Sequence, residues 1–196
     1  MYRQLSAWAG LCVMMVSIVG CSSSPPTVAD RPALESDALR TVTLATKQDP
    51  TLQAFFDNSA GYAVFPSVAK GGVGIGGAHG RGVLFQKGWL VGYCDLTQAS
   101  IGLQLGAQTY SELIFLETPA AVQRFTSGEF TVAAQATAVA LKSGSGASAD
   151  YSDAVAVFTL NESGLMGEAS IGGQRFRYAP AEQLPTPMTP QQRTGW

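Results

Sequence analysis

Glycine recurs at alternate positions through residues 70–83, KGGVGIGGAHGRGV. Successive side chains of an extended strand point to opposite faces, so the even positions from 72 to 82 give such a strand one face almost without side chains. The opposite face carries Val73, Ile75, Gly77, His79, Arg81 and Val83. Glycine loses more conformational entropy in a strand than other residues do, so a row of glycines needs a steric reason.

Two explanations of the bare face remain open at this stage. A face without side chains lets another backbone, an aromatic ring or an acyl chain come close. In the first explanation, the glycines allow tight packing on the sheet or strong curvature, with bends and bulges at some of them. In the second, they form a ligand groove, made by Gly72, Gly74, Gly76, Gly80 and Gly82.

The same glycines do not predict a nucleotide site. Gly72, Gly74 and Gly77 match the G-x-G-x-x-G fingerprint of dinucleotide-binding proteins. That fingerprint needs a helix that opens at the third glycine, because the helix N-terminus holds the pyrophosphate. The residues that follow, AHGRGVLFQ, are poor helix formers. We therefore expect no nucleotide.

Most of the chain after Gly61 has the period-two pattern of strands. The pattern predicts a strand that ends at Pro66, a single strand over residues 100–117, a turn at Lys87-Gly88 and a hairpin that turns at residues 161–164. Residues 130–142 fit a helix or a strand. Four aromatic residues are expected in the sheet core, with a ligand cage as the alternative: Tyr62, Phe65, Trp89 and Tyr93.

Three helices are predicted. Residues 33–47 place apolar side chains on one helical face. A second helix starts with Asp49 as its N-cap and Pro50 at its first position, and a third starts in the same way at Thr118-Pro119. The expected fold class is α+β: an antiparallel sheet of about seven strands, sandwich or barrel-like, with N-terminal and flanking helices.

The N-terminal residues predict a leader and a tether rather than part of the fold. An apolar run too short for a comfortable membrane span ends in SIVGC, which resembles the bacterial lipoprotein signal. That resemblance implies cleavage before Cys21 and its acylation; a plain secretory signal or an uncleaved anchor is the alternative. The expected domains are a signal peptide at 1–20, a flexible tether at 21–32, a folded domain at 33–179 and a disordered, proline-rich tail at 180–196.

Composition excludes several classes of protein. Charged residues make up 13% of the chain and the net charge is −2, which argues against a disordered chain and against a nucleic-acid binder. After cleavage, Cys94 is the single cysteine besides Cys21, so no disulfide is expected within the domain. Its apolar context, LVGYCDL, predicts a buried, inert thiol.

The segment AGYAVFPSVAKGGVGIGGAHGRGVL, followed by GLQLGAQ and SELIFL, resembles the SYLF-domain family over roughly residues 36–178. The resemblance implies one compact domain and, for the eukaryotic members, binding to phosphoinositide membranes and actin. Those members are described as using a basic N-terminal helix at the membrane. Residues 33–58 here are not basic, so phosphoinositide recognition is in doubt, and no actin is expected in a bacterial envelope.

The densest group of basic residues predicts a ligand-binding site. It consists of Lys70, which lies at a basic position of the family motif, with His79, Arg81 and Lys87. These side chains could hold a lipid phosphate by charge-assisted hydrogen bonds, or they could lie on a solvated face and pair with acidic residues. His79 is the chain's single histidine, and no second His or Cys pair has metal spacing, so we expect no metal and no cofactor.

We expect a non-catalytic protein, because no nucleophile elbow is present and no carboxylate pair lies outside predicted turns. The leading expectation is an outer-membrane lipoprotein whose domain binds phospholipid or another amphiphile and faces the periplasm or the cell surface. Ser22 after the cysteine favours the outer membrane by resemblance to sorting rules. The alternative is a structural or interaction protein of the envelope that binds a protein partner.

Overall fold

The computed structural model describes residues 26–73, 75–101, 106–128, 131–132, 139–140, 144, 146–161 and 173–181. Several predictions fall outside these residues: the signal peptide, acylated Cys21, Gly74, the turn at 162–164 and tail residues 182–196. They stay predictions.

Eight strands form one sheet in the order β5-β8-β3-β2-β1-β4-β7-β6. All pairs are antiparallel except β6 with β7. The α+β class and the antiparallel sheet are confirmed, and the sheet is open rather than closed into a barrel. The strands are β1 (Gly61–Val73), β2 (Ile75–Gln86), β3 (Trp89–Ile101), β4 (Gly106–Leu116), β5 (Thr131–Val132), β6 (Val139–Ala140), β7 (Val155–Asn161) and β8 (Gln174–Pro180).

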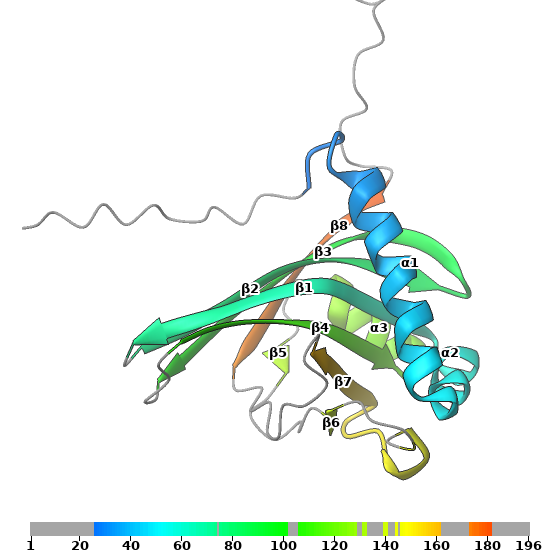
Figure 1. Ribbon diagram of the computed structural model, residues 1–196. Helices are drawn as coiled ribbons and strands as arrows, with labels where there is room; N and C mark the ends of the chain where they lie inside the picture. The colour runs from blue at the N-terminus through cyan, green and yellow to red at the C-terminus, as the bar shows by residue number, and fades with distance from the viewer. Residues whose placement is uncertain are drawn as a thin grey trace, which may run out of the picture.

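Helices cover both faces of this sheet (Figure 1). The predicted caps are confirmed: Asp49 accepts a hydrogen bond from Thr51 N, and Thr118 accepts one from Ala121 N. We call the face under α1 and α2 the outer face and the face under α3 the inner face. The helices are α1 (Arg31–Gln48), η1 (Pro50–Leu52), α2 (Gln53–Asn58), α3 (Pro119–Thr126) and η2 (Gly146–Ser148).

Each face of the sheet has its own apolar core. On the outer face, Ala38 and Ala45 of α1 and Phe55 of α2 pack over strand residues such as Phe115 and Phe158. On the inner face, α3 packs over a second cluster that contains Phe65, Val68, Leu84, Leu96, Ile114, Phe125 and Phe176. Most long strands are therefore apolar on both faces, which explains the high apolar content of the chain.

The sheet curls strongly around the inner face. The rings of Phe65 on β1 and Phe176 on β8 lie 5.7 Å apart, although β2 and β3 separate their strands in the sheet. Strands next to each other lie about 4.8 Å apart, so a flat sheet would place these two strands roughly 14 Å from each other. The inner face is therefore concave.

The glycines of β2 have a packing role where the structure describes their surroundings. A Cβ added to Gly82 would lie 2.6 Å from the ring of Phe65, and one added to Gly80 would lie 2.8 Å from Val68. Both glycines point to the inner face, and protein side chains already fill the space above them. At Gly80 and Gly82 the first explanation, tight packing in a curved sheet, is the one that the structure supports.

Two predicted strand boundaries are wrong. Strand β1 does not end at Pro66 but continues to Val73, because a bulge at Pro66 shifts the register against both neighbours and tolerates a residue without an N–H. Residues 100–117 are not one strand: β3 ends at Ile101, and β4 begins at Gly106 in the opposite direction. The alternating sequence pattern continues from β3 to β4 and does not indicate that the chain reverses direction between them.

Trp89 is a third departure from prediction. It is 78% exposed, whereas Phe65 and Tyr93 are buried as expected. Trp89 directly follows the predicted Lys87-Gly88 turn, where both residues have positive φ, and its side chain therefore stands at the tip of the β2–β3 hairpin. Cys94 is buried, as predicted.

Candidate functional site: a cationic ladder on the outer face

The four predicted ligand-binding residues do not form one group. His79 and Arg81 share the outer face of β2, as the alternation predicted. Lys70 pairs with Ala78, which belongs to the inner core, so Lys70 lies on the inner face. Lys87 lies in the β2–β3 turn at the far end of β2.

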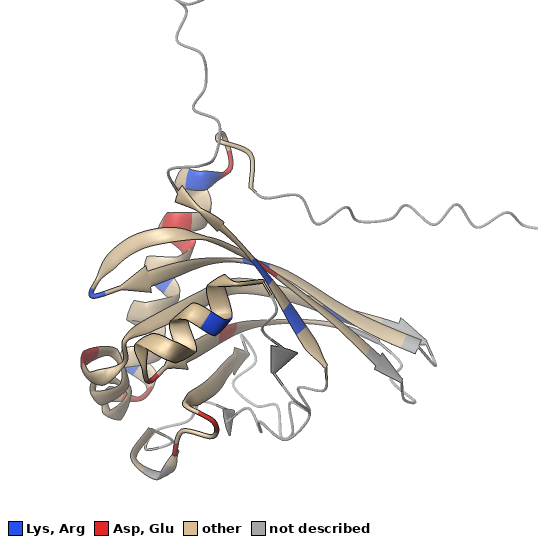
Figure 2. Cartoon of the chain, turned by 180° about the vertical axis from the view of Figure 1, so that it is seen from behind, with Lys and Arg blue, Asp and Glu red and all other residues tan. Residues whose placement is uncertain are grey.

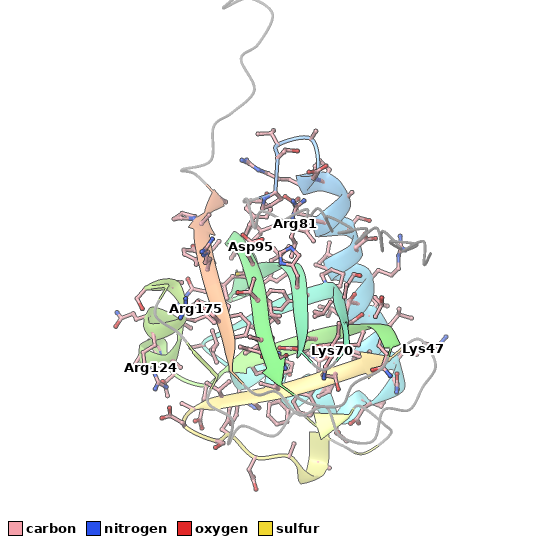
Figure 3. All side chains as sticks on the ribbon, turned by 90° about the vertical axis from the view of Figure 1, so that its left-hand side faces the viewer. Lys47, Lys70, Arg81, Asp95, Arg124 and Arg175 are labelled. Atoms are coloured by element: carbon pink, nitrogen blue, oxygen red, sulfur yellow. The ribbon has the colours of Figure 1, made fainter. Side chains whose placement is uncertain are left out.

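Two arginines of β8 complete a basic surface with His79 and Arg81. In the register of the sheet, Arg81 lies opposite Asp95 of β3, and Asp95 lies opposite Arg177 of β8. Two residues further along the strands, His79 lies opposite Thr97, and Thr97 lies opposite Arg175. We call these four basic residues, His79, Arg81, Arg175 and Arg177, the cationic ladder. Figure 2 shows the two basic positions along β8, and Figure 3 shows Arg81, Asp95 and Arg175 on neighbouring strands.

The β8 arginines were not predicted as site residues. Their signal in the sequence is the alternation in Gln-Arg-Phe-Arg-Tyr, in which buried Phe176 separates two exposed arginines. That pattern predicts that Arg175 and Arg177 share a face. It gives no information on which strand lies next to them, and therefore could not join them to His79 and Arg81.

Acidic residues balance part of the ladder's charge. Arg81 lies 3.5 Å from Asp30, and both side chains are partly exposed. Asp95 is buried between Arg81 and Arg177, and its Oδ1 has no hydrogen-bond partner among the described residues. Burial raises the pKa of Asp95, while the charges of His79, Arg81 and Arg177 act to lower it. Arg81 therefore fits the ion-pair interpretation better, and the end of the ladder at His79 and Arg175 is the more open to an anion.

The ladder lies beside the start of α1, from which the chain leads back to Cys21. Asp30 directly precedes α1, and the Arg31 guanidinium lies 5.3 Å from the ring centroid of Tyr93. The Tyr93 hydroxyl donates a 2.6 Å hydrogen bond to Glu35. Burial, followed by Glu35, raises the pKa of Tyr93 to about 12, so this hydroxyl keeps its proton at neutral pH. These contacts fix the first turns of α1 against the sheet at the ladder.

A groove of about 710 Å³ lies further along α1, between that helix and the bulged region of β1 and β4. The bulge displaces Pro66 and Ser67 from the regular pleat, and Ser111 Oγ donates to Pro66 O at 2.7 Å. Leu44, which is 54% exposed, stands over this opening. We call it the α1 groove; it is lined by Asp37, Arg40, Thr41, Leu44, Lys47, Gln48, Pro66, Ser67, Ser111 and Leu160.

The described part of the chain offers no other obvious chemistry. Within it, no three His, Cys, Asp or Glu side chains gather in a way that could hold a metal ion. The carboxylates of Asp150 and Asp153 are close in sequence and both are exposed, and Asp153 accepts a 2.9 Å hydrogen bond from Arg124. No helix in the described residues is both long and apolar enough to cross a membrane.

A family model described as Las17-binding protein actin regulator (Ysc84) matches residues 97–182. The resemblance to the SYLF family is confirmed. The matched SYLF segment includes β4, α3, β7 and β8, and so contains Arg175 and Arg177 but not His79 and Arg81. The chain is also similar to Beta cell expansion factor A of Aeromonas veronii, with 26% identity over 130 residues. The alignment covers 66% of this chain, which spans about half (49%) of the length of that relative.

Proposed function

We propose that this SYLF domain binds anionic lipid or another anionic amphiphile at a bacterial membrane surface, without catalysis. The observation that carries the proposal is the cationic ladder, which gathers four basic side chains on one face of a chain with a net charge of −2. The match of residues 97–182 to the SYLF-family model supports a lipid-binding or interaction role. The exposed arginines of the ladder suit a headgroup phosphate, which accepts charge-assisted hydrogen bonds.

Acylation of Cys21 would hold the ladder at the membrane. Asp30 lies nine positions after Cys21, and an extended chain of that length reaches about 30 Å. Each acyl methylene that enters the bilayer contributes about 0.8 kcal/mol, and more than one chain makes the attachment stable. The ladder then has only to orient the domain, for which about 1 kcal/mol per cation near an anionic surface is enough. We propose the outer membrane as the site of attachment, with the domain in the periplasm or at the cell surface.

The test is flotation of unacylated protein, residues 22–196, with phosphatidylcholine vesicles that contain or lack phosphatidylglycerol. We expect binding to the anionic vesicles alone. The variant Arg175→Ala should weaken it by about fivefold, as expected for one cation near an anionic surface. Arg124→Ala is the matched control, because Arg124 lies on α3 and pairs with Asp153 away from the ladder. Equal binding to both vesicle types, or an equal loss in the control, would overturn the role of the ladder.

A protein partner is the second candidate function, and the α1 groove favours it. Its lining is partly apolar, and the exposed Leu44 side chain stands above Pro66 and Leu160. A groove with an exposed leucine can take a side chain of a partner. If flotation fails and a Leu44→Asp variant loses a cross-linked envelope protein that the unchanged chain retains, this second function replaces the first.

A further inference from the structure

A buried hydrogen bond crosses the concave inner face. Gln174 Nε2 on β8 donates to Glu112 Oε2 on β4 at 3.0 Å, although β3, β2 and β1 separate the two strands in the sheet. The same amide nitrogen lies 3.4 Å from Gln98 Oε1. Glu112 and Gln174 are both 0% exposed. This contact joins the two sides of the curled sheet through polar groups in the middle of an apolar core.

The contact leaves two oxygen atoms without partners. Glu112 Oε1 and Gln174 Oε1 are both buried and have no hydrogen-bond partner among the described residues. Both are acceptors if Glu112 is ionised, so neither can satisfy the other. A buried acceptor without a donor keeps the penalty of losing its hydration, and this penalty is larger if the acceptor is charged. Two such atoms on a pair of side chains that already contact each other call for a common explanation.

One proton on Glu112 satisfies both atoms. A neutral carboxylic acid and a primary amide can form two parallel hydrogen bonds: the amide N–H donates to one carboxyl oxygen, and the carboxyl O–H donates to the amide oxygen. The first of these bonds is present as Gln174 Nε2 to Glu112 Oε2. We propose that Glu112 is a proton-binding site of the folded domain, with its proton on Oε1 donated to Gln174 Oε1, and that this pair is a pH-sensitive tie across the curled sheet.

Among the residues that the structure describes, the groups that face Glu112 supply no charge to stabilise the ionised form. On β4, Tyr110 donates to it; burial and Glu112 raise the pKa of this hydroxyl, so it stays neutral. The basic residue on the inner face of β1 is Lys70, which pairs with Gln108, whereas Glu112 pairs with Phe65 beyond the bulge. No ion pair of Glu112 is present among the described residues. The other described inner-face residues in this region are uncharged: Phe65 (β1), Gly82 (β2), Gln98 (β3), Phe125 (α3), Thr159 (β7) and Gln174 (β8).

Burial is also the dominant influence on the acid itself. It raises the pKa of Glu112 to about 7, against the hydrogen bonds from Gln174 and Tyr110, which lower it. The acid therefore changes charge close to neutral pH. Below that pH the tie holds β4 and β8 together. Above it, a carboxylate without a counter-charge lies in the apolar core, which favours separation of the two strands and access to the inner face.

The decisive experiment follows the side-chain carboxyl carbons of the unchanged protein by ¹³C NMR from pH 4 to pH 9, with the Glu112 signal identified by its loss in Glu112→Gln. We expect Glu112 to titrate near neutrality, at least two pH units above the value of about 4.3 for glutamate in model peptides. Titration of Glu112 near pH 4 would overturn the proposal, whatever the variant does.

Amide hydrogen exchange tests the tie itself. After correction for the intrinsic effect of pH, we expect protection of β8 amides to fall at least fivefold between pH 6 and pH 8.5 in the unchanged chain. Glu112→Gln should abolish this pH dependence, because its amide N–H donates to Gln174 at every pH. Glu117→Gln is the matched control and should behave like the unchanged chain. Protection that does not change with pH, or that falls equally in Glu112→Gln, would contradict a tie at Glu112.

Discussion

The ring of Phe65 covers the backbone of Gly82 so closely that a single added methyl group would lie 2.6 Å from its Cδ1 atom and 2.6 Å from Val64 O. Phe65 belongs to the bulged part of β1, and its ring also reaches Phe176 across the concave face. The glycine thus makes room for the ring that fills the curl of the sheet. This relationship accounts for part of the glycine row by packing rather than by a ligand.

Gly82→Ala should destabilise the domain by about 2–3 kcal/mol, because its Cβ would overlap both a ring and a backbone carbonyl that cannot move freely. Urea unfolding followed by circular dichroism measures the change. Ala69→Val is a suitable control: Ala69 is exposed on the neighbouring strand β1, where a β-branched side chain is tolerated. A Gly82→Ala protein as stable as the control would mean that Phe65 does not occupy this space.

Asp49→Ala should cost about 2 kcal/mol of stability, near the upper end for loss of a helix cap. Asp49 caps η1 through Thr51 N and also accepts a 2.7 Å hydrogen bond from the distant Gly146 N. Burial acts to raise the pKa of Asp49, but hydrogen bonds from Thr51, Gly146 and Gly144 bring it below its ordinary value. The stabilisation that Asp49 gives the folded domain is therefore present above about pH 4 and is lost as the pH falls further.

Thermal unfolding at pH 7 and pH 3 measures the Asp49 effect, since the variant should differ less from the unchanged chain at the lower pH. Asp57→Ala is the control, because Asp57 is exposed and accepts a hydrogen bond from Gln53 within its own helix. A loss at Asp57 as large as that at Asp49 would show that the link to Gly146 adds nothing.

The contribution of Glu112 to the free energy of unfolding should fall by roughly 3 kcal/mol as the pH rises from about 4.3 to above 7. The raised pKa of Glu112 means that folding binds a proton, so this stabilisation is complete below the unfolded-state pKa and is lost as the pH passes about 7. Urea unfolding at a series of pH values gives the slope. The difference between the unchanged chain and Glu112→Gln isolates the contribution of Glu112 from that of acids such as Asp49.

The Cys94 thiol should react with a disulfide reagent only after unfolding. Cys94 is 1% exposed, and burial, followed by the charge of Asp95, raises the pKa of its thiol well above the ordinary value. A thiol without thiolate character and without access is inert. We expect labelling in native buffer to be at least a hundredfold slower than in 6 M guanidinium. Rapid labelling of the native protein would contradict the burial of β3.

Binding to anionic vesicles should weaken at least tenfold between about 50 mM and 500 mM NaCl, because salt screens exposed charges beyond a few ångströms. The same titration on Arg175→Ala should have a shallower salt dependence, since Arg175 is an exposed member of the ladder. Salt-independent binding would indicate an apolar contact instead, such as one at Leu44.

Local signals made parts of the fold predictable. Asp49-Pro50 and Thr118-Pro119 begin helices because each cap acts within a few residues of its own position. The Lys87-Gly88 turn was predictable for the same reason. Pro66 was misread because a proline ends a strand unless a bulge accommodates it, and the bulge depends on both neighbouring strands.

The sequence by itself determined which side chains share a face: the alternation along β2 separates His79 and Arg81 from the glycines, and the alternation along β8 separates Arg175 and Arg177 from Phe176. Only the tertiary structure decided which faces meet. The order of strands puts β8 beside β3, which assembles the cationic ladder, and the curl of the sheet brings Gln174 to Glu112. A period of two fixes the direction of a side chain within its strand, whereas neighbours across a sheet are chosen by packing over the whole chain.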